Sequence, residues 1–268
     1  MRRAIATALA LTLAIGLVEG TAAARGRPNR PTRSGAAHVS GRPAPRAGVS
    51  ILFYGPSIAG HAKVNEIRVA RHLGFGVTKA SKGEWAAMSE DDFGAFDAIV
   101  FGDPNCKGGT DRLATALANR AVWSAAIHGP VVAEGTDPVW HANHGGEPGT
   151  TQLIVDTLTY VSSSGPTGLA VSLSCYYSGK RPGTKVKLLS DLGTFTVQGQ
   201  GRRPLPGCPN RIETPNPSDP FLVDLTAEDL SGWGCSIHEA FNSYPYGYRV
   251  IAQHAKSDLP YIIAGRRS

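Results

Sequence analysis

The chain has 268 residues, and 41% of them are hydrophobic, which excludes a wholly disordered or fibrous protein and leaves room for a sizeable core. Its formal net charge of +6 would suit a nucleic-acid-binding protein. The charge is uneven, however: eight arginines against one glutamate lie in residues 1–47, so residues 48–268 carry a net charge of −1 and we expect no nucleic-acid partner.

Residues 1–24 have the pattern of a cleavable secretory signal peptide. Arg2 and Arg3 are followed by the apolar run Ala4–Val18 and then by small residues at positions 22–24, where we expect cleavage. The apolar run is shorter than the roughly 20 residues that a spanning helix needs, so we expect no membrane span after cleavage. The sequence therefore predicts a secreted protein, either extracellular or periplasmic.

The rest of the chain divides into two parts. Residues 25–47 are rich in Arg, Pro, Gly and Ser and have almost no large apolar side chain, which predicts a disordered basic linker. Residues 48–268 have the length of one large α/β domain, and no internal stretch resembles a linker between domains.

Five short apolar runs predict buried strands, and segments with a period near 3.6 between them predict helices. Strands that alternate with helices pair in parallel through crossover connections. We therefore expect an α/β fold with a three-layer, doubly wound, mostly parallel sheet. The predicted strands cover residues 49–54, 76–80, 98–101, 130–134 and 168–173, and the predicted helices cover residues 64–73, 85–96, 111–126 and 151–161.

Beyond Ser178 the pattern changes. Residues 179–220 are rich in Gly and Pro, which predicts an irregular C-terminal extension. In this part, short strand signals stand out at residues 195–197, 248–253 and 261–264, and an amphipathic segment at residues 227–230.

Ligands of open α/β sheets bind outside the carboxyl ends of the strands, so the loops after the apolar runs are the candidate binding face. Asp103 and Asp137 each follow such a run and each precede a proline. Aspartate in this position either caps a turn or contacts a ligand, and both alternatives stay open. Tyr176 and Tyr177 after the fifth run would add rings that stack on a sugar, although such rings also pack in cores.

A divalent metal is possible at one of these loops. Asp137, His141 and His144 combine a carboxylate with two imidazoles, which is a ligand set for such ions. The two histidines would share a face only in a helix, and Gly145-Gly146 and Pro148 favour a loop over residues 137–146. We predict no other cofactor.

Cys175, at the end of the fifth apolar run, is the candidate nucleophile. A cysteine activated by a distant histidine, with a carboxylate behind it, is the arrangement of a thiolate nucleophile. His238 would be the base, and Glu239 or Asp137 would orient it.

The four cysteines of the chain form an even set, and in an exported protein such a set favours structural disulfides. Cys106 and Cys175 both follow predicted strands of one sheet, and Cys208 and Cys235 both lie in the extension. We therefore favour the pairs Cys106–Cys175 and Cys208–Cys235. In that pairing Cys175 is a half-cystine and not a free nucleophile.

Four short motifs stand out: Gly102-Asp103-Pro104, Gly135-Thr136-Asp137-Pro138, Leu173–Tyr177 and Leu230–Glu239. They resemble those of an uncharacterised family of secreted bacterial domains with the class I glutamine amidotransferase-like, or flavodoxin-like, fold. The resemblance covers residues 49 to about 264 and implies that fold without an established activity. Two features differ from true amidotransferases. Leu173 and Tyr177 flank Cys175 where small residues are usual, and His238 and Glu239 are adjacent where one residue usually separates the histidine from the glutamate.

These observations leave three functions open, and whether the chain is an enzyme stays undecided. The first is a disulfide-stabilised, non-catalytic module that binds a small molecule or a cell-envelope polymer. The second is a cysteine-dependent hydrolase of amide or ester bonds that uses Cys175. The third is a metal-dependent hydrolase that uses Asp137, His141 and His144.

Overall fold

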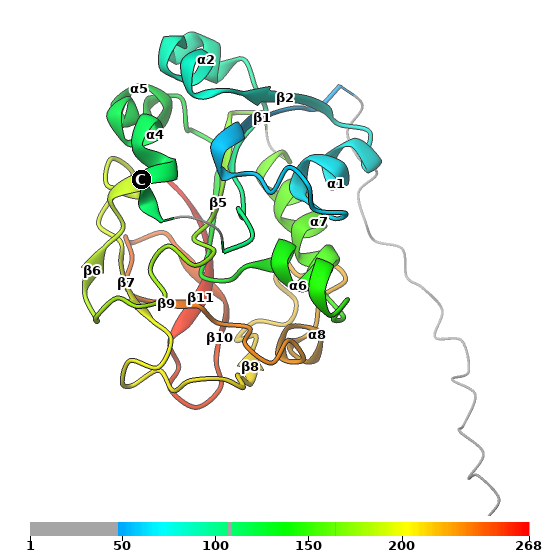
Figure 1. The fold of residues 1–268 in the computed structure, drawn as a ribbon, viewed down its shortest axis with the longest axis vertical. Helices are drawn as coiled ribbons and strands as arrows, with labels where there is room; N and C mark the ends of the chain where they lie inside the picture. The colour runs from blue at the N-terminus through cyan, green and yellow to red at the C-terminus, as the bar shows by residue number, and fades with distance from the viewer. Residues whose placement is uncertain (1–47, 107–108, 164, 268) are drawn as a thin grey trace, which may run out of the picture. The chain divides into compact units, whose positions relative to one another are not determined.

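The computed structural model describes residues 48–106, 109–163 and 165–267. The predicted signal peptide and linker lie outside the described residues. One sheet of eight strands forms the centre, in the order β2-β1-β3-β5-β4-β11-β10-β8 (Figure 1). The parallel strands are β1 (Ser50–Tyr54), β2 (Gly76–Ala80), β3 (Ala98–Phe101), β4 (Pro130–Glu134) and β5 (Gly168–Ser172). The antiparallel strands are β8 (Ile212–Glu213), β10 (Arg249–His254) and β11 (Pro260–Arg266).

The described helices are short, and polar side chains cap several of them. Asn65, Ser81, Ser89 and Thr226 each accept a hydrogen bond from a backbone N–H of the helix that they precede. The α-helices are α1 (Glu66–His72), α2 (Lys82–Ala87), α3 (Glu90–Gly94), α4 (Ala114–Ala118), α5 (Arg120–Ala125), α6 (Pro138–His144), α7 (Thr150–Val161) and α8 (Ala227–Ser231). The 3-10 turns are η1 (Gly55–Ser57), η2 (Thr110–Leu113) and η3 (Lys187–Leu189).

Both faces of β1, β3, β4 and β5 are buried, whereas β2 at the edge of the sheet is mostly exposed. In β1, Ile51 and Phe53 belong to one apolar cluster, whereas Leu52 and Tyr54 belong to a second cluster that contains Trp85. Figure 1 shows α1 and α7 on one side of these strands and α4 and α5 on the other. Burial on both faces explains why the strands are continuous apolar runs and do not alternate with polar residues. The expected mixed α/β fold with a large, mostly parallel sheet is therefore confirmed.

The C-terminal part contains more regular structure than its composition indicates. A second sheet of three antiparallel strands consists of β6 (Thr184–Lys185), β7 (Thr196–Gly199) and β9 (Glu239–Ser243). Strand β9 gives no clear signal in the sequence because it begins with the buried Glu239 and ends with exposed polar residues. None of the helices in the described ranges has the length and apolarity that crossing a bilayer requires.

The prediction of a loop over residues 137–146 is wrong, because Pro138–His144 form α6. Proline is favoured in the first turn of a helix, where its missing N–H and fixed φ cost nothing. Gly145 therefore ends this helix and does not prevent it.

Candidate functional site

Three neighbouring strands bring the candidate loops to one edge of the sheet. Strand β5 lies between β3 and β4, so the residues after these strands meet at their carboxyl ends. Cys106 follows β3 and Cys175 follows β5, and they form a disulfide with 5.0 Å between their Cα atoms. Cys208 and Cys235 form the other disulfide, with a Cα distance of 4.9 Å. Both predicted pairings are confirmed.

A glycine at the end of β4 positions His238. The carbonyl oxygen of Gly135 accepts hydrogen bonds from the backbone N–H groups of His238 and Glu239, at 2.9 and 3.0 Å. A Cβ atom at position 135 would lie 1.9 Å from the carbonyl oxygen of Glu239, so only glycine allows this approach. The contact places His238 beside Asp137, although the two residues are 101 positions apart in the sequence.

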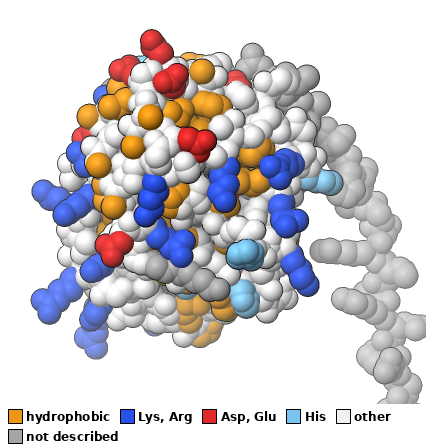
Figure 2. Space-filling view, turned by 45° about the horizontal axis from the view of Figure 1, so that its top comes forward, with side chains coloured by type: hydrophobic (Ala, Val, Ile, Leu, Met, Phe, Trp, Pro, Cys, Tyr) orange, Lys and Arg blue, Asp and Glu red, His pale blue; other side chains and the backbone are white. Residues whose placement is uncertain are grey.

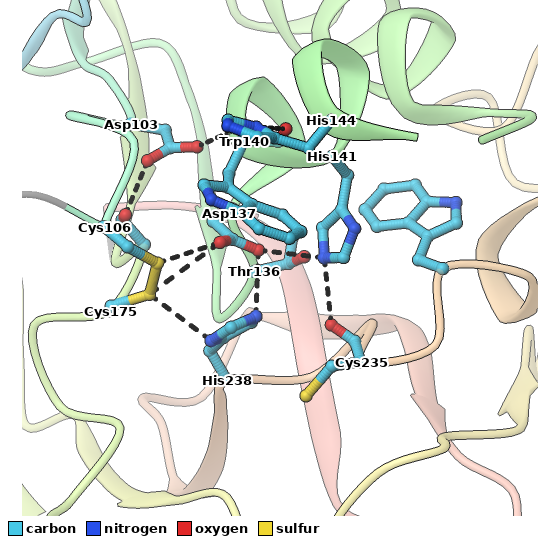
Figure 3. A network of polar contacts seen from close by, with 12 residues as sticks. Asp103, Cys106, Thr136, Asp137, Trp140, His141, His144, Cys175, Cys235 and His238 are labelled. Carbon is cyan, nitrogen blue, oxygen red and sulfur yellow. Dashed lines mark hydrogen bonds and ion pairs between the residues drawn. A yellow bond between two sulfur atoms is a disulfide. The ribbon is translucent and has the colours of Figure 1, made fainter. Parts of the chain in front are cut away.

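Cys175, His238 and Asp137 form a continuous chain of contacts (Figure 3). Cys175 Sγ lies 3.3 Å from His238 Nδ1, and His238 Nε2 lies 2.9 Å from Asp137 Oδ1 at ion-pair distance. The other carboxylate oxygen of Asp137 lies 2.9 Å from Cys106 Sγ and 3.8 Å from Cys175 Sγ. The disulfide sulfurs carry no proton, so these last two contacts become hydrogen bonds only after reduction. Thiol, imidazole and carboxylate therefore lie in the order that a cysteine nucleophile requires.

Asp137 is almost completely buried, with 1% of its side chain exposed. Burial acts to raise the pKa of this carboxyl, but its contacts with His141 and His238 outweigh burial and hold the pKa below its usual value. His141 Nε2 lies 3.2 Å from Asp137 Oδ1 and 3.1 Å from the Cys235 carbonyl oxygen. Burial acts to lower the pKa of His141, but the Asp137 carboxylate raises it overall. Asp137 is thus an ionised acceptor held between two imidazoles.

Asp103 connects the loops beneath the disulfide. It is fully buried and accepts hydrogen bonds from Ser174 Oγ at 2.6 Å and from the backbone N–H groups of Asn105, Val139 and Trp140. Burial, followed by the charge of Asp137, raises the pKa of Asp103 to about 6. Since its oxygens are used within the protein, Asp103 fixes the start of α6 and offers no exposed group to a ligand.

The other predicted residues after Cys175 are also buried. Glu239 is fully buried and accepts a hydrogen bond from the Tyr177 backbone N–H at 2.8 Å, and burial raises its pKa well above the usual value. Of the two carboxylates considered as partners of His238, the structure brings Asp137 to it. Tyr176 and Tyr177 pack in an apolar cluster, with only 7% and 6% of each residue exposed.

The predicted metal ligands do not all come together. His144 Nδ1 lies 2.7 Å from the Trp140 carbonyl oxygen, and its ring stacks on Trp140 with 4.5 Å between the ring centroids. Within the described ranges, a different group has its ligand atoms within 4.8 Å of one another: Cys106, Asp137, Cys175 and His238. This group can hold a metal ion only when the disulfide is open.

A groove of about 510 Å³ lies next to the disulfide, with Asn105 in its wall. Four of its lining side chains are basic or imidazole groups and none is acidic, which favours an anionic ligand. Lysine, arginine and histidine side chains also gather on the face seen in Figure 2, where acidic side chains lie mostly towards the top. The lining residues are Ile58, Ala59, Gly60, His61, Ala62, Lys63, Pro104, Asn105, Arg112, Asn143 and His144.

Sequence reasoning missed two further features of this site. The described chain has four non-glycine residues with positive φ, and three of them, Asn105, Cys106 and Ser174, surround the disulfide. Glu66 is buried at the start of α1 and accepts a hydrogen bond from the Asp103 backbone N–H at 2.6 Å. Serine and cysteine carry no signal for positive φ, but a lone glutamate within the apolar pattern of residues 64–73 could have indicated a buried acid.

No family model, curated protein or solved structure matches this chain. The resemblance to glutamine amidotransferase-like domains therefore remains an expectation from the sequence motifs alone.

Proposed function

We propose that this chain is an exported, cysteine-dependent hydrolase of amide or ester bonds that is inactive until the Cys106–Cys175 disulfide is reduced. One observation carries the proposal: Cys175, His238 and Asp137 form a continuous chain of contacts of 3.3 and 2.9 Å. The disulfides support the exported location, because such bonds persist in oxidising compartments.

The proposed mechanism begins with a dithiol reductant, which becomes a disulfide as Cys106 and Cys175 become thiols. His238 then takes the proton of Cys175, and the carboxylate of Asp137 stabilises the resulting imidazolium. The thiolate attacks the carbonyl carbon of the substrate, and the leaving amine or alcohol takes the proton from His238. Water, with His238 as its base, finally hydrolyses the thioester and restores the thiol.

Backbone strain near the disulfide supports a functional role. Residues with positive φ other than glycine cost about 1–3 kcal/mol each and concentrate at active and binding sites. Cys106 has a φ of 52° and Ser174 a φ of 50°. Ser174 precedes the proposed nucleophile, so its turn directs Cys175 out of the sheet edge towards His238.

The adjoining groove indicates the class of substrate. Its basic lining favours an acyl compound that bears a carboxylate or a phosphate. The backbone N–H groups of Tyr176 and Tyr177 already donate to Leu173 and Glu239, so they are not free to stabilise an oxyanion. Asn105 and Arg112 line the groove and are the side chains best suited to that task.

A non-catalytic binding module is the second candidate function. The observation that favours it is that both sulfurs are paired beside an accessible groove, so the oxidised protein has a binding surface and no free cysteine thiol. The amidotransferase-like, three-layer, doubly wound arrangement belongs to either proposal as an expectation from the sequence. The metal-dependent alternative gains no support from the position of His144.

Hydrolysis of p-nitrophenyl acetate by the mature protein, before and after reduction, tests the proposal. We expect turnover after reduction, turnover in Cys106→Ser without a reductant, and a loss of at least about 100-fold on adding His238→Ala to that variant. Cys106→Ser/Cys175→Ser is the matched control, because it lacks both the disulfide and the nucleophile. A folded Cys106→Ser variant that hydrolyses the ester no faster than this control would favour the binding module instead.

A further inference from the structure

We infer that the same site, once its disulfide is reduced, binds one zinc ion through Cys106, Cys175, His238 and Asp137. The donor atoms of these four residues already lie within 4.8 Å of one another. The inference does not depend on hydrolase activity, because it concerns only how these donors are arranged.

The distances suit tetrahedral zinc. Zinc lies about 2.3 Å from thiolate sulfur and about 2.0–2.2 Å from nitrogen or oxygen, so neighbouring ligand atoms are about 3.3–3.8 Å apart. Cys175 Sγ is 3.3 Å from His238 Nδ1 and 3.8 Å from Asp137 Oδ2, and Cys106 Sγ is 2.9 Å from Asp137 Oδ2. The two sulfurs must separate, which they do when the S–S bond breaks, and Cys106 Sγ must also move further from Asp137 Oδ2.

The surroundings of Asp137 support its role as a ligand. His141 Nε2 contacts Oδ1 at 3.2 Å, while Oδ2 faces the two sulfurs. A neighbouring group of this kind fixes the orientation of a ligating carboxylate and is typical of zinc sites. His141 is in turn held by the Cys235 carbonyl oxygen at 3.1 Å.

The donor set indicates which metal binds. Two thiolates and an imidazole favour zinc over magnesium or calcium, which prefer oxygen ligands. Two thiolates and one carboxylate carry three negative charges, so the zinc complex keeps a net charge of −1. Lys63 and Arg112 in the adjoining groove provide positive charge nearby.

Zinc and the disulfide exclude each other at this site. A dithiol reductant supplies two electrons and two protons to open the S–S bond. A phosphine supplies the two electrons and becomes a phosphine oxide, while water provides the oxygen and the two protons. Zinc then displaces both protons from the thiols. A small-molecule disulfide that reforms the bond takes up the two electrons, becomes two thiolates and releases the zinc ion. Because zinc would occupy Cys175 and all four positions are filled by protein groups, the zinc form holds the nucleophile inactive.

Cobalt substitution tests this inference without an activity assay. With the substitutions Cys208→Ser and Cys235→Ser, the mature protein has only the thiols of Cys106 and Cys175. A phosphine serves as the reductant so that it does not compete with these thiols for the metal. We expect one equivalent of Co²⁺ to give a thiolate-to-cobalt charge-transfer absorption in the reduced protein, none in the oxidised protein, and displacement by one equivalent of Zn²⁺.

Variants decide whether these four residues are the ligands. We expect His238→Ala or Asp137→Asn to weaken metal binding at least about tenfold. Cys175→Ser should weaken the charge-transfer band, because Cys106 remains as one thiolate ligand, and Cys106→Ser/Cys175→Ser should abolish it. His144→Ala is the matched control and keeps full affinity, since His144 lies outside the group. Reduced, folded protein without the band, or a band of unchanged intensity in Cys175→Ser, would overturn the inference. Neither outcome decides the proposed hydrolase activity, which is measured separately as ester hydrolysis by the reduced protein.

Discussion

Replacing Cys106 with serine opens the disulfide and leaves Cys175 as a free thiol 3.3 Å from His238 Nδ1. An imidazolium next to a thiol stabilises the thiolate, and Asp137, 2.9 Å from His238 Nε2, stabilises the imidazolium. We therefore expect Cys175 in this variant to react with iodoacetamide at a pH where an ordinary thiol is nearly inert.

The size of the effect follows from the thiolate population. An ordinary thiol with a pKa of about 8.5 is about 0.3% thiolate at pH 6, whereas a thiol with a pKa of about 6.5 is about 24% thiolate. The nucleophilicity of a thiolate falls with its pKa, with a Brønsted coefficient of about 0.45, so this 75-fold gain in thiolate becomes about a tenfold gain in rate.

Cys208→Ser is the matched control, because it frees Cys235, and both Cys235 and Cys175 are partly buried. Alkylation rates between pH 5 and 9, measured by mass spectrometry of the labelled peptide, should be about tenfold higher for Cys175 at pH 6. His238→Ala added to Cys106→Ser should remove the difference. Equal rates for the two freed cysteines at every pH would refute the argument that His238 activates Cys175.

Folding must be verified before those rates are compared. The Cys106–Cys175 bond spans 69 positions and the Cys208–Cys235 bond spans 27. Chain entropy predicts that opening them costs about 4.4 and about 3.6 kcal/mol, so each variant loses a large and similar part of the free energy of unfolding. Circular dichroism and urea unfolding of both variants show whether the compared proteins are folded.

Two further predictions concern the support of the site. Gly135→Ala places a Cβ 1.9 Å from a backbone oxygen, so we expect it to destabilise the domain by at least about 2 kcal/mol in urea unfolding, whereas Gly60→Ala, with open space around its Cβ, should have little effect. Burial, followed by the charge of Asp103, raises the pKa of Glu66 from 4.5 to about 8. A raised carboxyl pKa stabilises the folded state below the unfolded pKa, and this contribution is lost as pH rises from about 5 to about 8. The Tm of Glu66→Gln should therefore fall less than that of the unchanged protein over this pH range. An unchanged dependence of Tm on pH would contradict the raised pKa of Glu66.

The strands could be predicted from the sequence because their signal is local. Residues 98–101 and 130–134 are apolar on both faces, and the structure places β3 and β4 over those residues. The disulfide pairing could also be predicted, since Cys106 and Cys175 follow strands whose carboxyl ends share one edge. These predictions needed only the pattern of apolar residues and the rule that the carboxyl ends of parallel strands lie at one edge of the sheet.

The partner of His238 could not be predicted in the same way. The contact with Asp137 depends on the close approach of Gly135 to the start of β9, which joins segments about 100 residues apart. Strand β9 itself has a weak sequence signal. Its first residue, Glu239, is a buried carboxyl that accepts a hydrogen bond from the Tyr177 backbone N–H, where a buried strand usually has an apolar side chain. The sequence therefore left Glu239 and Asp137 open as partners of His238, and the chain topology selects Asp137.

The two disulfides of this chain allow a comparison that separates a staple from a reactive site. Cys208–Cys235 has Gln200 Nε2 and the Ile237 carbonyl oxygen as neighbours of its sulfurs, both uncharged. Cys106–Cys175 instead has a buried carboxylate and an imidazole at its sulfurs. Burying an ionised carboxyl costs several kcal/mol unless it is well paired, and a staple gains nothing from that cost. The protein pairs Asp137 with His141 and His238, which keeps the carboxylate charged next to a sulfur. We propose that this arrangement serves chemistry at Cys175 after reduction, since the stability of the bond that covers it gains nothing from a buried charge.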